Sequence, residues 1–120
     1  MKITQCLHTA LLVSDLDRAK HFYETILELS PAPRNLNFPG AWYQIGDYQI
    51  HLIANTDFVG GIANREKWGR NGHIAFDVDN LNELEQRLQA EHWPLQRSSS
   101  GRAAIFIQDP DGNVIEINQL

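Results

Sequence analysis

The chain has 120 residues, the size of a single domain, and its 42% apolar and 21% charged residues exclude a disordered or collagen-like chain. A net charge of −5, without any basic run, argues against nucleic acid as a partner. No uninterrupted apolar run approaches the ~20 residues that cross a bilayer, so no membrane span is expected. The single cysteine, Cys6, cannot form an internal disulfide, which fits the reducing cytoplasm.

The first part of the chain predicts a strand followed by a helix. Residues 7–13 alternate between apolar and polar and end in strand formers, as a half-buried strand does. We expect a helix to begin at Ser14, which forms a capping-box-like pair with Asp17. Its apolar residues follow at helical spacing, and Pro31 and Pro33 are expected to stop it.

Strands and one further helix complete the expected elements. Strands are predicted over 41–45 and 49–54 with a tight hairpin at Gly46-Asp47, and a short strand near 33–36 is a further possibility. The rest of the chain then predicts, in order, a strand at 72–78, a helix from about Asn80 to Glu91, and strands near 103–108 and 113–118. The turn between the last two, Asp109-Pro110-Asp111-Gly112, carries a strong turn signal.

The chain resembles itself when its second half is laid over its first. His8-Thr9-Ala10-Leu11-Leu12-Val13 aligns with His73-Ile74-Ala75-Phe76-Asp77-Val78, a sequence offset of 65, and the later apolar positions of the two halves align as well. We interpret the chain as two copies of a strand–helix–strand–strand–strand unit, about 5–57 and 70–120, within one domain over 1–120. The joining segment 55–71 is long for a structureless link, and such segments can cover a site.

Strand alternation places four ligand-type side chains on the sheet faces that do not carry the helices. His8, His51, His73 and Glu116 are these residues, and the same offset relates His8 to His73 and His51 to Glu116. Four solvated, hydrogen-bonded strand residues would be the plainer explanation. A symmetric set of three imidazoles and one carboxylate on one concave face is unusual, however, and a divalent ion satisfies all of them. The pattern therefore favours a metal site.

These motifs resemble the vicinal oxygen chelate superfamily, which includes glyoxalase I, methylmalonyl-CoA epimerase, extradiol dioxygenases and bleomycin-resistance proteins. The resemblance rests on the paired units, the opening from His8 to Leu16, the segment 71–76 and the closing segment 109–116. It implies an α+β fold of two βαβββ units whose curled mixed sheets form a half-barrel cup with the helices outside. It also implies a metal at His8, His73 and Glu116, with His51 at the fourth position. Glyoxalase-like members carry Gln or Glu there, so His51 is either a ligand or a base.

Two further residues are candidates for contacting a substrate. Arg102 opens the strand beside the one that bears Glu116, where it is either an anion-binding residue or a solvated arginine. Trp42 and Tyr43 alternate, so that one of them should face the cup and wall an apolar substrate.

Three functions are consistent with these residues. The first is a metal-dependent lyase or isomerase similar to glyoxalase I, which acts on a small oxygen-chelating substrate through an enolate-type intermediate, with Glu116 or His51 as the base. The second is an extradiol-type dioxygenase, because His8, His73 and Glu116 form a two-histidine, one-carboxylate set suited to Fe(II). The third is a bleomycin-resistance-like binding protein without catalysis, against which the retained ligands count. The residue set accepts Zn, Ni, Fe or Mn.

We also expect a homodimer. Short, two-unit members of the superfamily pair about a two-fold axis, and a cup can close within one chain or between two. We favour shared sites, in which His8 and His51 come from one chain while His73 and Glu116 come from the other.

Overall fold

The computed structural model describes all 120 residues, and the chain divides into two compact units, Met1–Val59 and Gly60–Leu120. Each unit holds one four-stranded mixed sheet and one main helical segment, in the order strand, helix, strand, strand, strand, and a 3-10 turn precedes the first strand of the second unit. The predicted α+β class with two βαβββ units is therefore confirmed. Neither unit contains a helix with the length and apolarity needed to cross a membrane.

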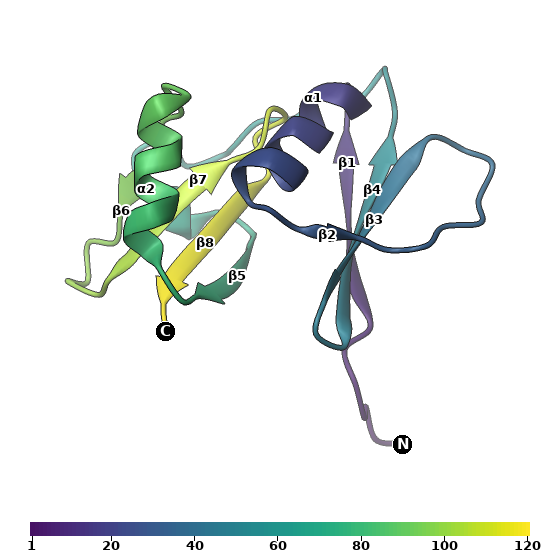
Figure 1. Cartoon of the computed structure of the whole chain (residues 1–120), viewed down its shortest axis with the longest axis horizontal. Coiled ribbons are helices and arrows are strands. Elements are labelled where there is room, and N and C mark those ends of the chain that lie inside the picture. The colour runs from purple at the N-terminus through teal and green to yellow at the C-terminus, as the bar shows by residue number, and fades with distance from the viewer. The chain divides into compact units, whose positions relative to one another are not determined.

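In the first unit the strand order is β1-β4-β3-β2, with β1 parallel to β4 and the other pairs antiparallel (Figure 1). Its elements are β1 (His8–Val13), α1 (Leu16–Lys20), the π-helical η1 (His21–Ile26), β2 (Ser30–Pro31), β3 (Gly40–Ile45) and β4 (Tyr48–Ala54). The side chains of α1 and η1 that point to the sheet, Ala19, Phe22, Tyr23 and Ile26, are fully buried, as are Tyr43 and Ile50 of the sheet. One sheet face is thus occupied by the helix.

The second unit repeats this arrangement, with strand order β5-β8-β7-β6 and β5 parallel to β8. Its elements are the 3-10 turn η2 (Trp68–Arg70), β5 (His73–Val78), α2 (Leu81–Ala90), β6 (Gln96–Arg97), β7 (Ala104–Gln108) and β8 (Val114–Gln119). The buried face of α2 consists of Leu81, Leu84 and Leu88, and the buried isoleucines of the sheet are Ile105, Ile107, Ile115 and Ile117.

The internal repeat extends to the pairing of individual residues. In the first unit Ala10 pairs with His51, and at the equivalent place in the second unit Ala75 pairs with Glu116. The β1–β4 and β5–β8 ladders therefore have the same register. This equivalence puts His51 and Glu116 at the same position of their two sheets.

Between these ladders the repeat slips by a single position. The helix N-caps, Asp15 and Asn80, keep the offset of the ladders, whereas the left-handed residues that end the helices, Glu28 (φ 55°) and His92 (φ 53°), lie one position closer together. The first helix therefore contains an extra residue, which the π-helical η1 accommodates. Along the chain, paired residues of β7 and β8 are one residue further apart than the equivalent paired residues of β3 and β4. This extra residue restores the offset of the ladders in β8.

Three local predictions were wrong. The first helix is capped by Asp15, whose Oδ1 accepts a hydrogen bond from the backbone N of Arg18 at 3.0 Å, and not by Ser14 with Asp17. The helix ends before the prolines, because Glu28 turns left-handed and the backbone N of Leu29 donates to the O of Tyr23 at 2.9 Å. The short strand lies at Ser30–Pro31, not near 33–36, since β3 pairs with the segment directly after the helix.

Candidate functional site

The first unit brings His8, His51 and Trp42 together on three adjacent strands, and we call this group the first half-site. The rings of His8 and His51 stack with centroids 4.0 Å apart and planes at 14°. On its other side His51 stacks on Trp42, with centroids 4.2 Å apart and planes at 9°. Trp42, rather than Tyr43, is thus the aromatic residue on the histidine face, and Tyr43 is buried beneath the helix.

The environment of His51 favours the neutral imidazole. Burial lowers its pKa, and the positive charges of His8 and Arg34 lower it further. The ring Nε2 lies 2.8 Å from Oε1 of Gln49, a carbonyl oxygen that can only accept, so Nε2 carries the hydrogen. In the neutral ring this leaves the lone pair of His51 on Nδ1.

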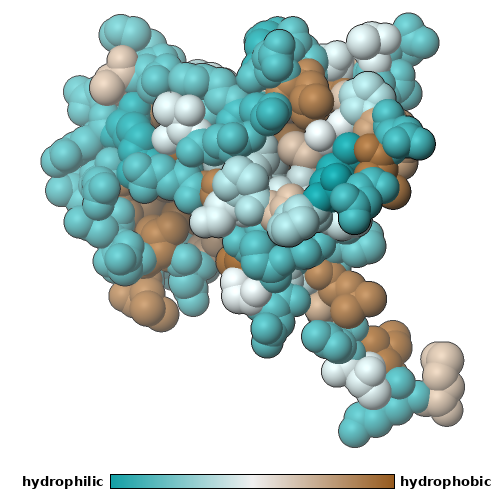
Figure 2. All heavy atoms as spheres, turned by 45° about the vertical axis from the view of Figure 1, so that its right-hand side comes forward, coloured by the Kyte–Doolittle hydropathy of each residue, from teal (hydrophilic) through white to brown (hydrophobic).

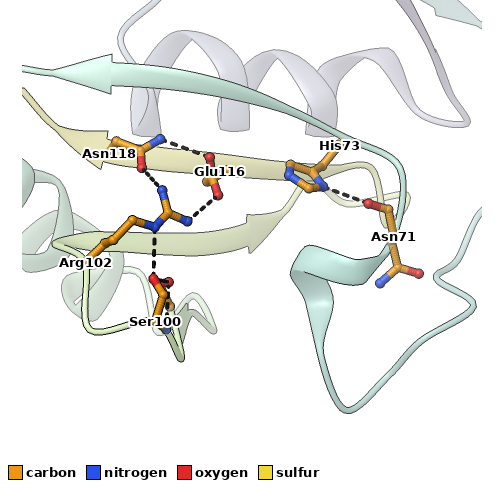
Figure 3. A network of polar contacts seen from close by, with 7 residues as sticks. Asn71, His73, Ser100, Arg102, Glu116 and Asn118 are labelled. Carbon is orange, nitrogen blue, oxygen red and sulfur yellow. Dashed lines mark hydrogen bonds and ion pairs between the residues drawn. The ribbon is translucent and has the colours of Figure 1, made fainter.

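The second unit holds the equivalent group of His73, Glu116 and Phe106, the second half-site (Figure 3 labels the first two). The Nδ1 of His73 donates to the backbone O of Asn71 at 2.7 Å, which places the lone pair of the neutral ring on Nε2. Phe106 meets the His73 ring edge-on, with centroids 5.6 Å apart and planes at 87°. A ring nitrogen hydrogen-bonded to a carbonyl is the common arrangement of histidines that bind metals.

Glu116 is held in a network of polar side chains. Only 9% of the residue is exposed, and its two oxygens accept from Nη2 of Arg102 and Nδ2 of Asn118, each at 3.1 Å (Figure 3). Burial alone would raise the pKa of Glu116, but the hydrogen bonds from Asn118 and Arg102, with the charges of Arg102 and His73, outweigh it and lower the pKa. The carboxylate is therefore ionised over the whole physiological range.

Arg102, predicted from the sequence to open a strand, lies two residues before β7 and reaches Glu116 from there. Its Nε donates to Oγ of Ser100 at 2.9 Å and its Nη1 to Oδ1 of Asn118 at 3.0 Å, in addition to the bond with Glu116 (Figure 3). The arginine considered as a substrate contact is thus also an ion-pair partner of the candidate ligand.

Sequence reasoning missed the residues that orient the half-sites. Gln49 and Asn118 lie two positions from His51 and Glu116, so strand alternation puts each on the same face as its neighbour, and this signal was available. Phe106 was missed because it is equivalent to Trp42 at an offset of 64 residues. The sequence alignment used the offset of the ladders, 65 residues, which does not pair these two aromatic residues.

The donor set fits a divalent ion. Within either unit no three His, Cys, Asp or Glu side chains form a group that could hold a metal, since each half-site supplies two. Three imidazoles and one carboxylate together are a set that Zn, Ni, Fe and Mn accept. The hydrogen bonds of His51 and His73 leave one ring nitrogen of each free for such a role.

Two βαβββ units, each with one mixed sheet and with ligand-type residues at equivalent positions, define a class of small α+β proteins built from an internal repeat. The sequence profile of the Glyoxalase/Bleomycin resistance protein/Dioxygenase superfamily matches residues 5–117, and the chain belongs to this superfamily.

Its relatives carry the names of enzymes. The chain is 31% identical to a protein of Vibrio cholerae named "Probable lactoylglutathione lyase", over 94% of this chain and 88% of that protein. It is 24% identical to the mitochondrial methylmalonyl-CoA epimerase of Homo sapiens, over 93% of this chain and 72% of that protein.

Solved structures share the fold. A glyoxalase/dioxygenase from Nostoc punctiforme superimposes with a TM-score of 0.77 at 22% identity, covering 96% of this chain and 90% of that one. A lactoylglutathione lyase from Agrobacterium tumefaciens does so with a TM-score of 0.69 at 24% identity, covering 99% and 96%.

Proposed function

We propose that this protein is a metal-dependent lyase or isomerase of the glyoxalase I type. It would act on a small substrate with two neighbouring oxygens by moving a proton at the carbon beside a carbonyl group, through an enolate-type intermediate. The observation that carries the proposal is the equivalent placement of His51 and Glu116 in two sheets of the same register, each near a histidine. The names of the relatives support the reaction class.

One divalent ion, Zn, Ni, Fe or Mn, would be held by residues of both half-sites. When bound, such an ion acts as a Lewis acid that stabilises negative charge developing on a substrate oxygen. His8, His73 and Glu116 are the ligands in this proposal. Because Glu116 is already ionised, binding of the cation requires no proton to leave it.

His51 would act as the base rather than as a fourth ligand. A ligand lone pair lies in the ring plane, and the planes of His8 and His51 are nearly parallel with centroids 4.0 Å apart. Because the two rings are stacked face to face, their in-plane lone pairs do not converge on one point that is ~2.0–2.2 Å from a nitrogen of each ring. In this arrangement only one of the two rings can therefore bind the ion. The neutral His51 ring, oriented by Gln49 and Trp42, is then free to take the proton.

Glu116 is less suited to proton abstraction than His51. Its pKa is lowered, and both of its oxygens already accept hydrogen bonds. A carboxylate whose pKa is lowered is a weaker base, so the proposed role of Glu116 is to hold the ion and balance its charge.

The test is to load metal-free protein with each of the four metals and to follow two reactions. These are the formation of lactoylglutathione from glutathione and methylglyoxal, and the incorporation of solvent deuterium into methylmalonyl-CoA. Turnover that depends on metal in either assay supports the proposal. Oxygen consumption with a catechol substrate, without either reaction, would point to a dioxygenase instead. Binding of bleomycin without turnover of any substrate would point to a binding protein.

We further propose a homodimer in which two chains share each site. Because β1 is an edge strand, its free edge is open to pairing, and the segment around it exposes Ile3, Leu7 and Leu12 by 83%, 64% and 40%. Figure 2 shows the N-terminal segment protruding with apolar side chains on its surface. The free Cys6 supports a reducing compartment, the cytoplasm, as the place of action.

A further inference from the structure

The second unit contains a cavity of about 380 Å³ beside η2, β6 and the start of β7. This volume lies within the ~300–1,000 Å³ range of small-molecule sites. Four cationic side chains line the cavity against one carboxylate, Glu66, although the whole chain carries a charge of −5. The cations are Lys67, Arg70, Arg97 and Arg102. Positive charge is therefore concentrated at this one place on an acidic protein.

The four cations fall into two pairs. Arg97 forms an ion pair with Glu85 and Arg102 with Glu116, so that half of the positive charge is balanced by carboxylates outside the cavity lining. Lys67 and Arg70 make no ion pair in the structure and are exposed to solvent. These two residues leave the cavity with a surplus of positive charge after Glu66 is counted.

Hydrogen-bond donors accompany the charge. The loop Ser98–Ser100 contributes three serines to the lining, and the hydroxyls of Ser98 and Ser100 are bonded to each other at 2.7 Å. Arg102 uses three of its guanidinium N–H groups on Ser100, Asn118 and Glu116. Since a guanidinium has five, two remain to donate to a bound anion.

The segment that bears Lys67 and Arg70 is fixed in place within its unit. The side chain of Gln96 accepts from the backbone N of Trp68 and donates to the O of Glu66, both at 2.8 Å. Gly69 lies so close to Phe106 that an added Cβ would be 2.5 Å from its ring. The cationic residues are thus carried on a backbone already held against β6 and β7, which lowers the entropy cost of binding.

We propose that this cavity is a binding site for an oxyanion group, the phosphate or carboxylate at one end of a small ligand. Lys67 and Arg70 supply the unbalanced charge, and Arg102 and the serine hydroxyls supply directed hydrogen bonds. Arg102 also contacts Glu116, so a bound anion and the second half-site share one side chain. The proposal does not depend on the proposed reaction, because the site needs no metal.

The test is a titration of metal-free, isotope-labelled protein at constant ionic strength, followed by backbone amide shifts. The probes are inorganic phosphate, glycerol phosphate and succinate. The variant K67Q/R70Q removes the two unpaired cations, and the matched control R18Q/K20Q removes two exposed cations of α1 in the other unit. The amide spectrum of each variant verifies that it folds.

We expect saturable shifts at residues 67–70 and 98–102, with affinity about tenfold weaker in K67Q/R70Q and changed by less than about twofold in the control. Tighter binding of glycerol phosphate than of the other probes would identify a phosphate monoester as the ligand group. Tighter binding of succinate would identify a carboxylate. The proposal is overturned if no probe gives saturable shifts, or if the control variant weakens binding as much as K67Q/R70Q does.

Discussion

At the scale of single residues, the roles of the two histidines in the first half-site depend on how their rings lie. A neutral imidazole has one lone pair, so His51 can be a ligand or a base but not both at once. Its stacking on His8 and Trp42 and its bond to Gln49 are the reasons why we propose it as the base and not as a ligand. Sequence alone left this choice open, because alternation gives the face of a side chain and not the plane of its ring.

Replacing His51 therefore separates metal binding from catalysis. In His51→Ala, which leaves no donor atom at this position, we expect the metal content to stay at the wild-type level and kcat to fall by a factor of about 10²–10⁴, the usual contribution of a general base. Elemental analysis and steady-state kinetics on the same preparation check this. Loss of the metal from His51→Ala would make His51 a ligand. Full activity with full metal would remove it from the reaction.

A second residue-scale prediction concerns the hydrogen bond between the buried Tyr43 and the half-buried Glu24. The Tyr43 hydroxyl donates to Oε2 of Glu24 at 2.7 Å, and burial first, then the bond and charge of Glu24, raises the pKa of Tyr43. Tyr43→Phe should lower the free energy of unfolding by about 1–3 kcal/mol near pH 7, because the hydrogen bond to a charged group is lost.

The same pair predicts a pH dependence. A group whose pKa is raised by folding gives its full stabilisation below its unfolded pKa, about 10 for tyrosine, and loses it as the pH rises further. The difference in unfolding free energy between wild type and Tyr43→Phe should thus shrink above pH ~10. Denaturant unfolding at pH 7 and at pH ~11 measures it, and the other tyrosines cancel in the comparison. A difference that stays constant over this range would contradict the assignment.

At the scale of elements, the positions of the long strands and of α2 could be predicted from the sequence, whereas the ends of the first helix could not. Ser14, Asp15 and Asp17 are all possible caps, so local pattern does not choose among them. The repeat does choose, since Asp15 is the position equivalent to Asn80, which caps α2. The left-handed ends of both helices were missed because neither residue there is glycine, the usual sign of such an end.

The left-handed end of α2 gives a stability prediction. His92 has φ 53°, a conformation that costs a residue with a side chain ~1–2 kcal/mol. His92→Gly removes this cost and adds some entropy to the unfolded chain, so we expect a net gain of about 0.5–1 kcal/mol.

The matched control is Gln86→Gly, an exposed position in the interior of the same helix, where a loss of about 1 kcal/mol is expected. Chemical denaturation of both variants measures the two shifts. Shifts of the same sign would show that His92 is not strained.

At the scale of the whole molecule, the repeat explains how a chain of 120 residues carries two pairs of ligand-type residues at equivalent positions. Each unit buries one sheet face under its helix and carries half of the ligand-type residues on its sheet. The offset of 65 shared by the β1–β4 and β5–β8 ladders was sufficient to identify His8 with His73, and His51 with Glu116, as equivalent positions. It could not identify which chain completes each half-site, because both arrangements use the same residues.

The central claim, that one ion is bound by both half-sites, is tested most directly with variants at the equivalent positions His8 and His73. We expect His8→Asn and His73→Asn each to lose the metal as homodimers, whereas the control His92→Asn keeps it, since asparagine tolerates the left-handed conformation there. Light scattering on the wild type should show a dimer. A monomer that still holds its metal would contradict the shared arrangement.

Differently tagged copies of the two variants are then refolded together, and the mixed dimer is isolated and analysed for metal. With sites shared between chains, one of its two sites combines two intact half-sites, so the account predicts one ion per mixed dimer. No ion in the mixed dimer would contradict sharing, and metal retained in either variant alone would contradict the claim that both units hold the ion.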